Sequence, residues 1–92
     1  MGFMYILLCE KDRLYVGSTI DLEKRLTQHF KGEGANFTKK FKPIKLIYFE
    51  EFFTILSAFQ REKQVQRWSR TKKNALIEGN SNLLISSSKK IF

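Results

Sequence analysis

The sequence predicts an α+β fold in which a small three-stranded sheet is combined with helices. Three segments rich in apolar, β-branched and aromatic residues, at 3–9, 13–17 and 44–50, predict the strands. Between and after these segments, apolar residues recur at helical spacing. With 92 residues, of which 42% are hydrophobic, the chain is expected to form one core and no second module.

The first two strands are expected to form a β-hairpin around the three-residue loop Glu10-Lys11-Asp12. Facing residues of a hairpin have a constant sum of residue numbers, and a loop of odd length makes that sum even. Residues of odd number on both strands then share a face, because side chains alternate along a strand. Both phenols should therefore lie on one face. The expected pairs are Cys9 with Arg13, Leu7 with Tyr15, and Tyr5 with Gly17.

A helix is predicted after the second strand, with Ser18 and Thr19 available to cap it. Gly32 and Gly34 are expected to end this helix. Its inward face should consist of apolar residues spaced four apart, which are Leu22, Leu26 and Phe30.

Arg25 and His29 also stand four apart on this helix, so they should share one face beside the apolar stripe. Arginine offers a planar fork for a phosphate, and histidine can transfer protons near neutral pH. A purely structural role for each residue is the alternative explanation.

A polar, glycine-containing loop is predicted over 32–42, before Pro43 introduces the third strand. Lysines interleaved with aromatic residues suit a surface that binds phosphate while its rings pack or stack. Alternatively, the two phenylalanines hold the loop against the core. The residues concerned are Phe37, Lys39, Lys40, Phe41 and Lys42.

Ser57 and Gln60 have the pattern of a capping box, which predicts a second helix from Ser57. Glu62 lies in the middle of its apolar stripe. Burying a carboxylate there is costly unless it meets a cation or a metal. An ion pair with Arg25 and a more exposed position are the two structural alternatives. The stripe itself comprises Ala58, Phe59, Val65, Trp68 and Ser69.

Thr71 is expected to cap a third, short helix that runs to Ile77 and is ended by Gly79. Lys72 and Lys73 fall in its first turn, where the helix dipole disfavours cations unless a phosphate approaches. We expect the domain to cover residues 1–80. Residues 81–92 should form a partly disordered extension, with one packing turn at Leu83, Leu84 and Ile85 and a frayed end at 86–90.

The formal charge of +8 is concentrated late in the chain, where residues 61–92 hold eight basic and two acidic residues. Such a field attracts polyanions, above all nucleic acid, although a solvated basic surface is the simpler alternative. The single cysteine, Cys9, cannot form an internal disulfide, so a cytoplasmic location is expected. The apolar segment 3–9 is too short to span a membrane, and no membrane partner is expected.

Five motif elements occur along the chain in the order Tyr5, Tyr15-Val16-Gly17, Arg25, His29 and Glu62. In their type and order they resemble the motif of the GIY-YIG nuclease domain. The chain is most similar to the small stand-alone bacterial members, which are related to the amino-terminal domain of the excinuclease C subunit of DNA repair. The similarity extends to about residue 80. Two positions depart from the pattern: Phe3-Met4-Tyr5 stands in place of Gly-Ile-Tyr, and Val16 in place of isoleucine.

The resemblance implies an antiparallel sheet flanked by helices, and phosphodiester hydrolysis assisted by one Mg²⁺ or Mn²⁺ ion. By position, Tyr5 and Tyr15 would hold or deprotonate the attacking water, and Arg25 would bind the scissile phosphate. His29 would assist proton transfer or orient a tyrosine. Glu62 would be the sole protein ligand of the metal. Because the pKa of a free tyrosine is about 10, a phenol acts as a base near neutral pH only beside a cation.

Three functions are consistent with these features. The first is a metal-dependent endonuclease acting on DNA rather than RNA, with a protein partner supplying specificity. The second is a non-catalytic nucleic-acid-binding module of the same fold, and the third is a protein-interaction adaptor. The oligomeric state is not predicted. In the first function, the residues that position the nucleic-acid backbone are Lys39, Lys40, Lys72 and Lys73.

Overall fold

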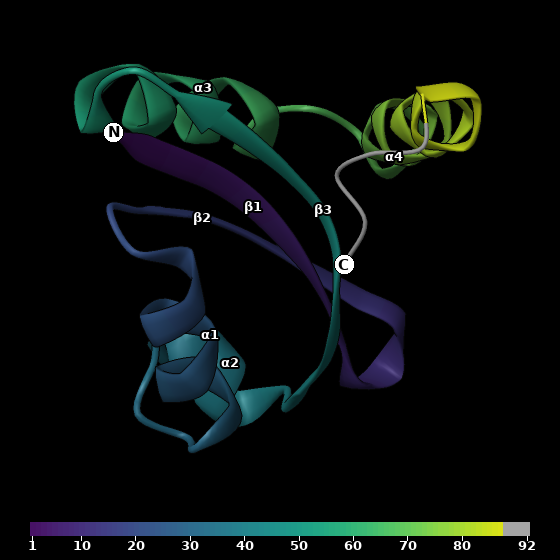
Figure 1. Cartoon of the computed structure of the whole chain (residues 1–92). Coiled ribbons are helices and arrows are strands. Elements are labelled where there is room, and N and C mark those ends of the chain that lie inside the picture. Colours follow the sequence, from purple (N-terminus) through teal and green to yellow (C-terminus); the bar gives the residue numbers. More distant parts are fainter. Residues whose placement is uncertain (88–92) are drawn as a thin grey trace.

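The computed structural model describes the backbone of residues 1–87 and the side chains of residues 1–79. It confirms the predicted α+β fold with a three-stranded antiparallel sheet flanked by helices (Figure 1). The strands are β1 (Gly2–Cys9), β2 (Arg13–Thr19) and β3 (Pro43–Phe52), and the helices are α1 (Leu22–Phe30), α2 (Asn36–Lys40), α3 (Ile55–Gln66) and α4 (Arg70–Ser87).

The sheet has the order β2-β1-β3, so the first strand of the chain is its central strand. The predicted hairpin register is confirmed: Leu7 faces Tyr15 and Tyr5 faces Gly17. A three-residue helical turn, Glu10–Asp12, closes the hairpin, with Lys11 and Asp12 at positive φ. Both tyrosines therefore project from the same face of the sheet.

Helices cover both faces of the sheet, which divides the core into two apolar clusters (Figure 1). The even-numbered residues of β1 face α3 and α4, and the odd-numbered residues face α1 and α2. This double coverage explains why β1 is apolar on both sides. The buried members of the first cluster are Met4, Ile6, Val16, Tyr48 and Val65, and those of the second are Tyr5, Leu7 and Cys9.

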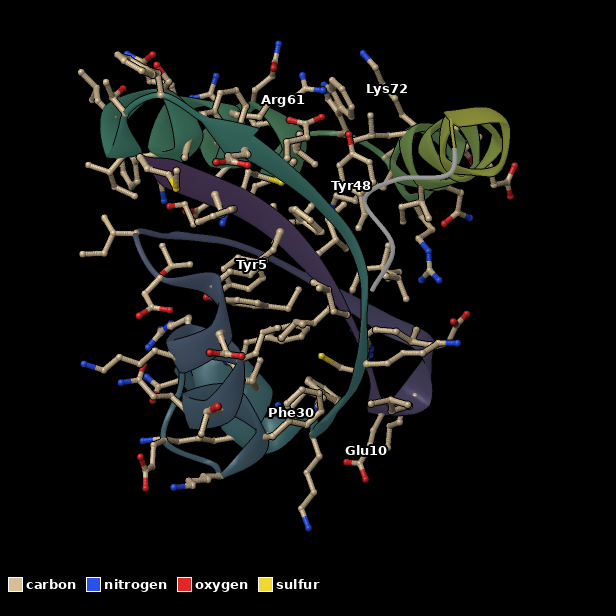
Figure 2. The ribbon with its side chains drawn as sticks, in the orientation of Figure 1. Tyr5, Glu10, Phe30, Tyr48, Arg61 and Lys72 are labelled. Carbon is tan, nitrogen blue, oxygen red and sulfur yellow. The ribbon has the colours of Figure 1, made fainter. Side chains whose placement is uncertain are left out.

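Helix α1 begins later than predicted, because Ser18 and Thr19 still belong to β2. Asp21 is the N-cap, and its side chain accepts a hydrogen bond from the Lys24 backbone N–H at 3.0 Å. The helix ends before Gly32, which has φ +80°. The inward face was predicted incorrectly at Phe30, which is 50% exposed (Figure 2).

The predicted loop over 32–42 contains the short helix α2. Its phenylalanines pack rather than face solvent. The Phe37 ring lies 5.7 Å from the Tyr15 ring and 5.2 Å from the Phe41 ring, measured between centroids. The alternative in which both rings hold this segment against the core is therefore confirmed.

Helix α3 begins at Ile55, two residues before the predicted start. Its N-cap is Thr54, whose hydroxyl accepts a hydrogen bond from the Ser57 backbone N–H at 3.1 Å. Ala58, Glu62 and Val65 are buried as the stripe predicted, but Phe59 is 46% exposed and Ser69 is exposed.

A part-buried polar network joins helix α3 to β3, with Arg61 above Tyr48 (Figure 2). The Arg61 guanidinium donates two hydrogen bonds to Glu50, at 2.9 and 3.1 Å, and Tyr48 donates its hydroxyl to the same carboxylate. Hydrogen bonding to Glu50 raises the pKa of Arg61, so the guanidinium stays charged. Arg61 turns towards β3, and its neighbour Glu62 turns towards β2, where it meets Ser18.

Helix α4 starts at Arg70 and runs to Ser87, so Gly79 does not end it. The cap is Ser69, whose hydroxyl accepts a hydrogen bond from the Lys72 backbone N–H at 3.2 Å, instead of Thr71. The side chains of Leu83–Ile85 and all of 88–92 lie outside the described residues. The boundary at residue 80 and the frayed end therefore stay predictions.

Cys9 is buried and unpaired. Burial, reinforced by the Glu10 carboxylate, raises the pKa of its thiol. Within residues 1–87, every helix is too short or too polar to cross a lipid bilayer.

The cap of α3 predicts unequal effects of two neighbouring substitutions. Thr54→Ala should lower the free energy of unfolding by about 1 kcal/mol, because the Ser57 N–H loses its partner. Ser57→Ala keeps that bond and should cost less than about 0.5 kcal/mol. Urea unfolding of both variants measures the difference, and a larger loss for Ser57→Ala would place the cap at Ser57.

Candidate active site

The two predicted tyrosines lie beside His29 under helix α1. The ring centroids of Tyr5 and Tyr15 are 6.2 Å apart, and each lies close to the imidazole, at 5.7 and 5.2 Å respectively. Tyr5 is completely buried, whereas Tyr15 is partly exposed. Of the two phenols, only Tyr15 can therefore contact a bound substrate directly.

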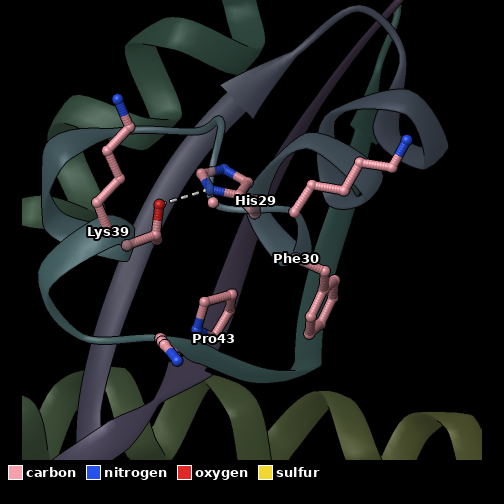
Figure 3. A pocket seen from close by; sticks show the side chains of 8 residues that line it. His29, Phe30, Lys39 and Pro43 are labelled. Carbon is pink, nitrogen blue, oxygen red and sulfur yellow. Dashed lines mark hydrogen bonds between the residues drawn. The ribbon is translucent and has the colours of Figure 1, made fainter.

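His29 is buried and hydrogen-bonded through both ring nitrogens. Its Nε2 lies 2.7 Å from the Tyr5 hydroxyl, and its Nδ1 lies 2.9 Å from the Thr38 hydroxyl (Figure 3). The Thr38 hydroxyl in turn donates to the Ala35 carbonyl at 2.9 Å. Burial, aided by the nearby positive charge of Arg25, lowers the pKa of His29 to about 4. The imidazole is therefore neutral at pH 7.

Two glycines allow these rings to pack closely. A Cβ atom at Gly17 would lie 2.6 Å from the Tyr5 hydroxyl oxygen and 2.9 Å from the Tyr15 ring. A Cβ atom at Gly34 would lie 2.3 Å from Nδ1 of His29. No side chain fits at either position without moving an aromatic ring.

Arg25 projects from α1 beside both phenols, and its guanidinium donates to Gln28 at 3.0 Å. Burial raises the pKa of Tyr5 and of Tyr15, and the positive charge of Arg25 opposes this rise at both residues. The negative charge of Glu62 adds to the rise at both. Both phenols thus keep their protons at neutral pH unless more positive charge arrives.

Glu62 reaches the same edge of the sheet from the opposite face. It lies on α3 and is only 9% exposed. Its Oε1 accepts a hydrogen bond from the Ser18 hydroxyl at 2.5 Å, and its Oε2 accepts one from the Gln66 amide at 2.7 Å. The predicted alternative of an ion pair with Arg25 is wrong. Among the described side chains, the Glu62 carboxylate pairs with exposed Lys63, at 3.8 Å.

The Glu62 carboxylate has the chemistry of a hard-metal ligand. No group of three or more His, Cys, Asp or Glu side chains capable of holding a metal occurs within residues 1–79. A bound Mg²⁺ or Mn²⁺ would therefore keep most of its water ligands, which suits Mg²⁺. Each Glu62 oxygen accepts one hydrogen bond and retains further acceptor capacity. The donor set fits such an ion.

A cleft of about 440 Å³ opens beside Arg25, between the end of β2 and helix α1. It borders Ser18, the residue that holds Glu62, and both Lys24 and Arg25 line it. This cleft therefore connects the guanidinium with the strand end that carries the carboxylate's partner. The full lining is Ser18, Thr19, Ile20, Asp21, Lys24, Arg25 and Gln28.

The four lysines predicted to bind the nucleic-acid backbone do not gather on one surface. Lys39 and Lys40 end α2, on the face of the sheet that carries the phenols, and Lys39 lines a pocket of about 480 Å³ next to His29 (Figure 3). Lys72 and Lys73 begin α4, on the other face of the sheet. The Lys72 ammonium lies 4.3 Å from the Trp68 ring centroid (Figure 2).

Three polar residues that support the site were missed by the sequence analysis: Ser18 and Gln66 hold Glu62, and Thr38 holds His29. Gln66 had a detectable signal, because it follows Glu62 by four residues on the same helix. Ser18 and Thr38 are recognisable only from the tertiary structure.

The sequence matches the pattern that defines the GIY-YIG catalytic domain over residues 1–74. The chain is 37% identical over 81 residues to a UPF0213 protein of Haloquadratum walsbyi, covering 88% of this chain and 91% of that protein. It is 42% identical over 76 residues to a UPF0213 protein of Bacillus pumilus, covering 83% and 78%.

A similar fold has been solved. The solution NMR structure of a UPF0213 protein from Bacillus halodurans superimposes with a TM-score of 0.55 at 33% sequence identity. The superposition covers 85% of this chain and 84% of that protein. Both the sequence and the fold are therefore shared with small proteins of this kind.

The close approach at Gly17 predicts a destabilising substitution. Gly17→Ala should lower the free energy of unfolding by about 1–3 kcal/mol, because the new methyl group displaces the Tyr5 and Tyr15 rings. In α4, the methyl group of Gly79→Ala has no neighbour within 4 Å among the described residues and should raise stability by about 0.5–1 kcal/mol. Thermal unfolding of both variants should give opposite signs, and equal signs would contradict the packing described.

Burial of His29 predicts a loss of stability in acid. Its pKa is lowered from 6.5 to about 4 in the folded protein, so the unfolded chain binds more protons between these values. Stability should therefore fall as the pH falls through this window, by up to about 3 kcal/mol. Urea unfolding across the window measures the slope. The His29→Gln variant should lack this contribution to the pH dependence of stability. An identical slope in the variant and the wild type would refute the lowered pKa of His29.

Proposed function

The chain belongs to the GIY-YIG family, and we propose that it is a metal-dependent endonuclease that hydrolyses phosphodiester bonds in DNA. The fold is of the nuclease type, and proteins with this domain are generally endonucleases. The observation that carries the proposal is the convergence at β2 of Tyr15 and Arg25 from one face of the sheet and of Glu62 from the other. A binding surface alone would not require a carboxylate held inside the protein.

In this proposal, Glu62 holds one Mg²⁺ or Mn²⁺ ion. When bound, the ion stabilises negative charge on the phosphate and lowers the pKa of a coordinated water. Ser18 and Gln66 fix the carboxylate from both sides, so it does not have to reorganise when the ion and the substrate bind.

The guanidinium of Arg25, at the wall of the cleft, would bind the non-bridging oxygens of the scissile phosphate. Tyr15 would hold the attacking water and accept its proton once positive charge near Glu62 and Arg25 lowers the pKa of the phenol. Tyr5 and His29 lie behind Tyr15 and are buried, so their role is to orient it.

The remaining parts of the proposal concern the substrate and the setting. The resemblance to the excinuclease C subunit favours DNA over RNA and suggests a role in DNA repair. A cytoplasmic location and a protein partner that supplies specificity belong to the same proposal. Lys39 and Lys40 would contact the backbone on the phenol side, whereas Lys72 and Lys73 would contact it only if the substrate extends around the molecule.

The alternative is a non-catalytic nucleic-acid-binding module. The position of Lys72 and Lys73, on the face of the sheet away from the phenols, is the observation in its favour. Such a module would bind in a salt-sensitive way, would ignore divalent metal and would be unaffected by changes at Glu62.

Cleavage assays separate the two functions. We expect the purified protein to cleave branched, single-stranded or duplex DNA in the presence of Mg²⁺ or Mn²⁺. Glu62→Gln and Tyr15→Phe should each lower kcat/KM by at least about 100-fold, because they remove the metal ligand and the group that activates water.

Glu33→Gln provides the matched control, because it also neutralises one carboxylate but at an exposed position outside the cleft. It should cleave like the wild type. If Glu62→Gln and Tyr15→Phe cleave as fast as the wild type, the activity is contamination and the nuclease proposal fails.

A further inference from the structure

The hydrogen bonds around His29 form a chain of buried groups that determines where each proton lies. Tyr5 and His29 are completely buried, and Thr38 is 1% exposed. The chain runs from the Tyr5 hydroxyl through Nε2 and Nδ1 of His29 to the Thr38 hydroxyl and on to the Ala35 carbonyl. Three protons must be placed along it: one on Tyr5, one on the neutral imidazole and one on Thr38.

Assigning these protons from the far end gives one consistent arrangement. A carbonyl only accepts, so the Thr38 hydroxyl donates its single proton to Ala35. The Thr38 oxygen then accepts from Nδ1, which must carry the imidazole proton. Nε2 is left with a lone pair and accepts the proton of the Tyr5 hydroxyl. Each donor in the chain has an acceptor.

The reverse arrangement leaves a buried donor without a partner. If Nε2 carried the proton, it would donate to Tyr5, and the Tyr5 hydroxyl would need another acceptor. Among the described residues, this hydroxyl hydrogen-bonds to His29, and the nearby Arg25 guanidinium can only donate to it. Leaving a buried donor without an acceptor destabilises the folded protein, which favours the first arrangement.

We propose that Thr38 is a positioning residue that keeps the His29 proton on Nδ1 and thereby holds the Tyr5 hydroxyl as a donor to Nε2. The lone pairs of the Tyr5 oxygen then remain available to hydrogen-bond donors on the side of Arg25. The effect on catalysis rests on the proposed nuclease function, but the position of the proton does not.

The imidazole also packs against Gly34. Gly34 lies so close to the imidazole that any Cβ there would overlap Nδ1. The segment 34–38 therefore supplies both the hydrogen-bond acceptor for Nδ1 and the space that the ring occupies. This gives α2 a role in the site, although it carries neither of the two phenols.

The only histidine of the chain makes this inference directly measurable. In ¹⁵N NMR spectra, a protonated and an unprotonated imidazole nitrogen have distinct shifts, and the signals need no assignment to a residue. We expect Nδ1–H and unprotonated Nε2 in the wild type near pH 7. A wild-type ring that is protonated on Nε2 would overturn the inference.

Substitutions at Thr38 test its role. Thr38→Val removes the acceptor for Nδ1–H and should move a substantial part of the proton population to Nε2, whereas Thr38→Ser should keep the wild-type spectrum. Thr27→Val is the matched control, because Thr27 is exposed on α1 and its hydroxyl donates to the Glu23 carbonyl of the same helix. A Thr38→Val spectrum identical to that of the wild type would overturn the positioning role.

Kinetics test the catalytic consequence. Thr38→Val should lower kcat by roughly five-fold with little change in KM, since the lost hydrogen bond acts through Tyr5 and not through substrate binding. Thr38→Ser keeps the hydroxyl and should have the wild-type kcat. Unchanged kcat in Thr38→Val would refute the catalytic effect. A wild type without cleavage would refute the proposed function, while the NMR result still decides the position of the proton.

Discussion

The length of one turn determines the geometry of the whole site. Because the loop between β1 and β2 has three residues, Tyr5 faces Gly17, and both phenols project from one side of the hairpin. A loop one residue longer or shorter would change the parity of the register and place the two phenols on opposite faces. Gly17 is required by the same register, since it lies directly against the Tyr5 hydroxyl.

The site is built around an edge strand and not within one face of the sheet. The phenols and Arg25 belong to the side covered by α1 and α2, and Glu62 belongs to the side covered by α3. In the sheet formed by residues 1–87, strand β2 has a neighbour on one side only, so groups from both faces can meet at its free edge. Within the described part of the chain, each buried side-chain nitrogen and oxygen has a hydrogen-bond partner, which indicates a preorganised arrangement.

The sequence was sufficient where a local pattern determines the outcome. Alternation and loop parity predicted the strands and their register, and helical spacing predicted that Glu62 faces inwards. Helix starts were predicted less well, because Thr54 and Ser57 are both good capping residues and only the backbone path decides between them. The exposure of Phe30 and Phe59 depends on which helix packs where, and the contacts of Ser18 and Thr38 join segments that are separate in the sequence.

The buried thiol of Cys9 has a practical consequence for experiments on this protein. It packs with Tyr5 and Leu7, and its raised pKa keeps the nucleophilic thiolate scarce. Maleimide reagents should therefore leave the native chain unlabelled. A cysteine introduced on the rim of the cleft would then be the one reactive position, which allows a fluorophore or cross-linker to be attached there without first removing the natural cysteine.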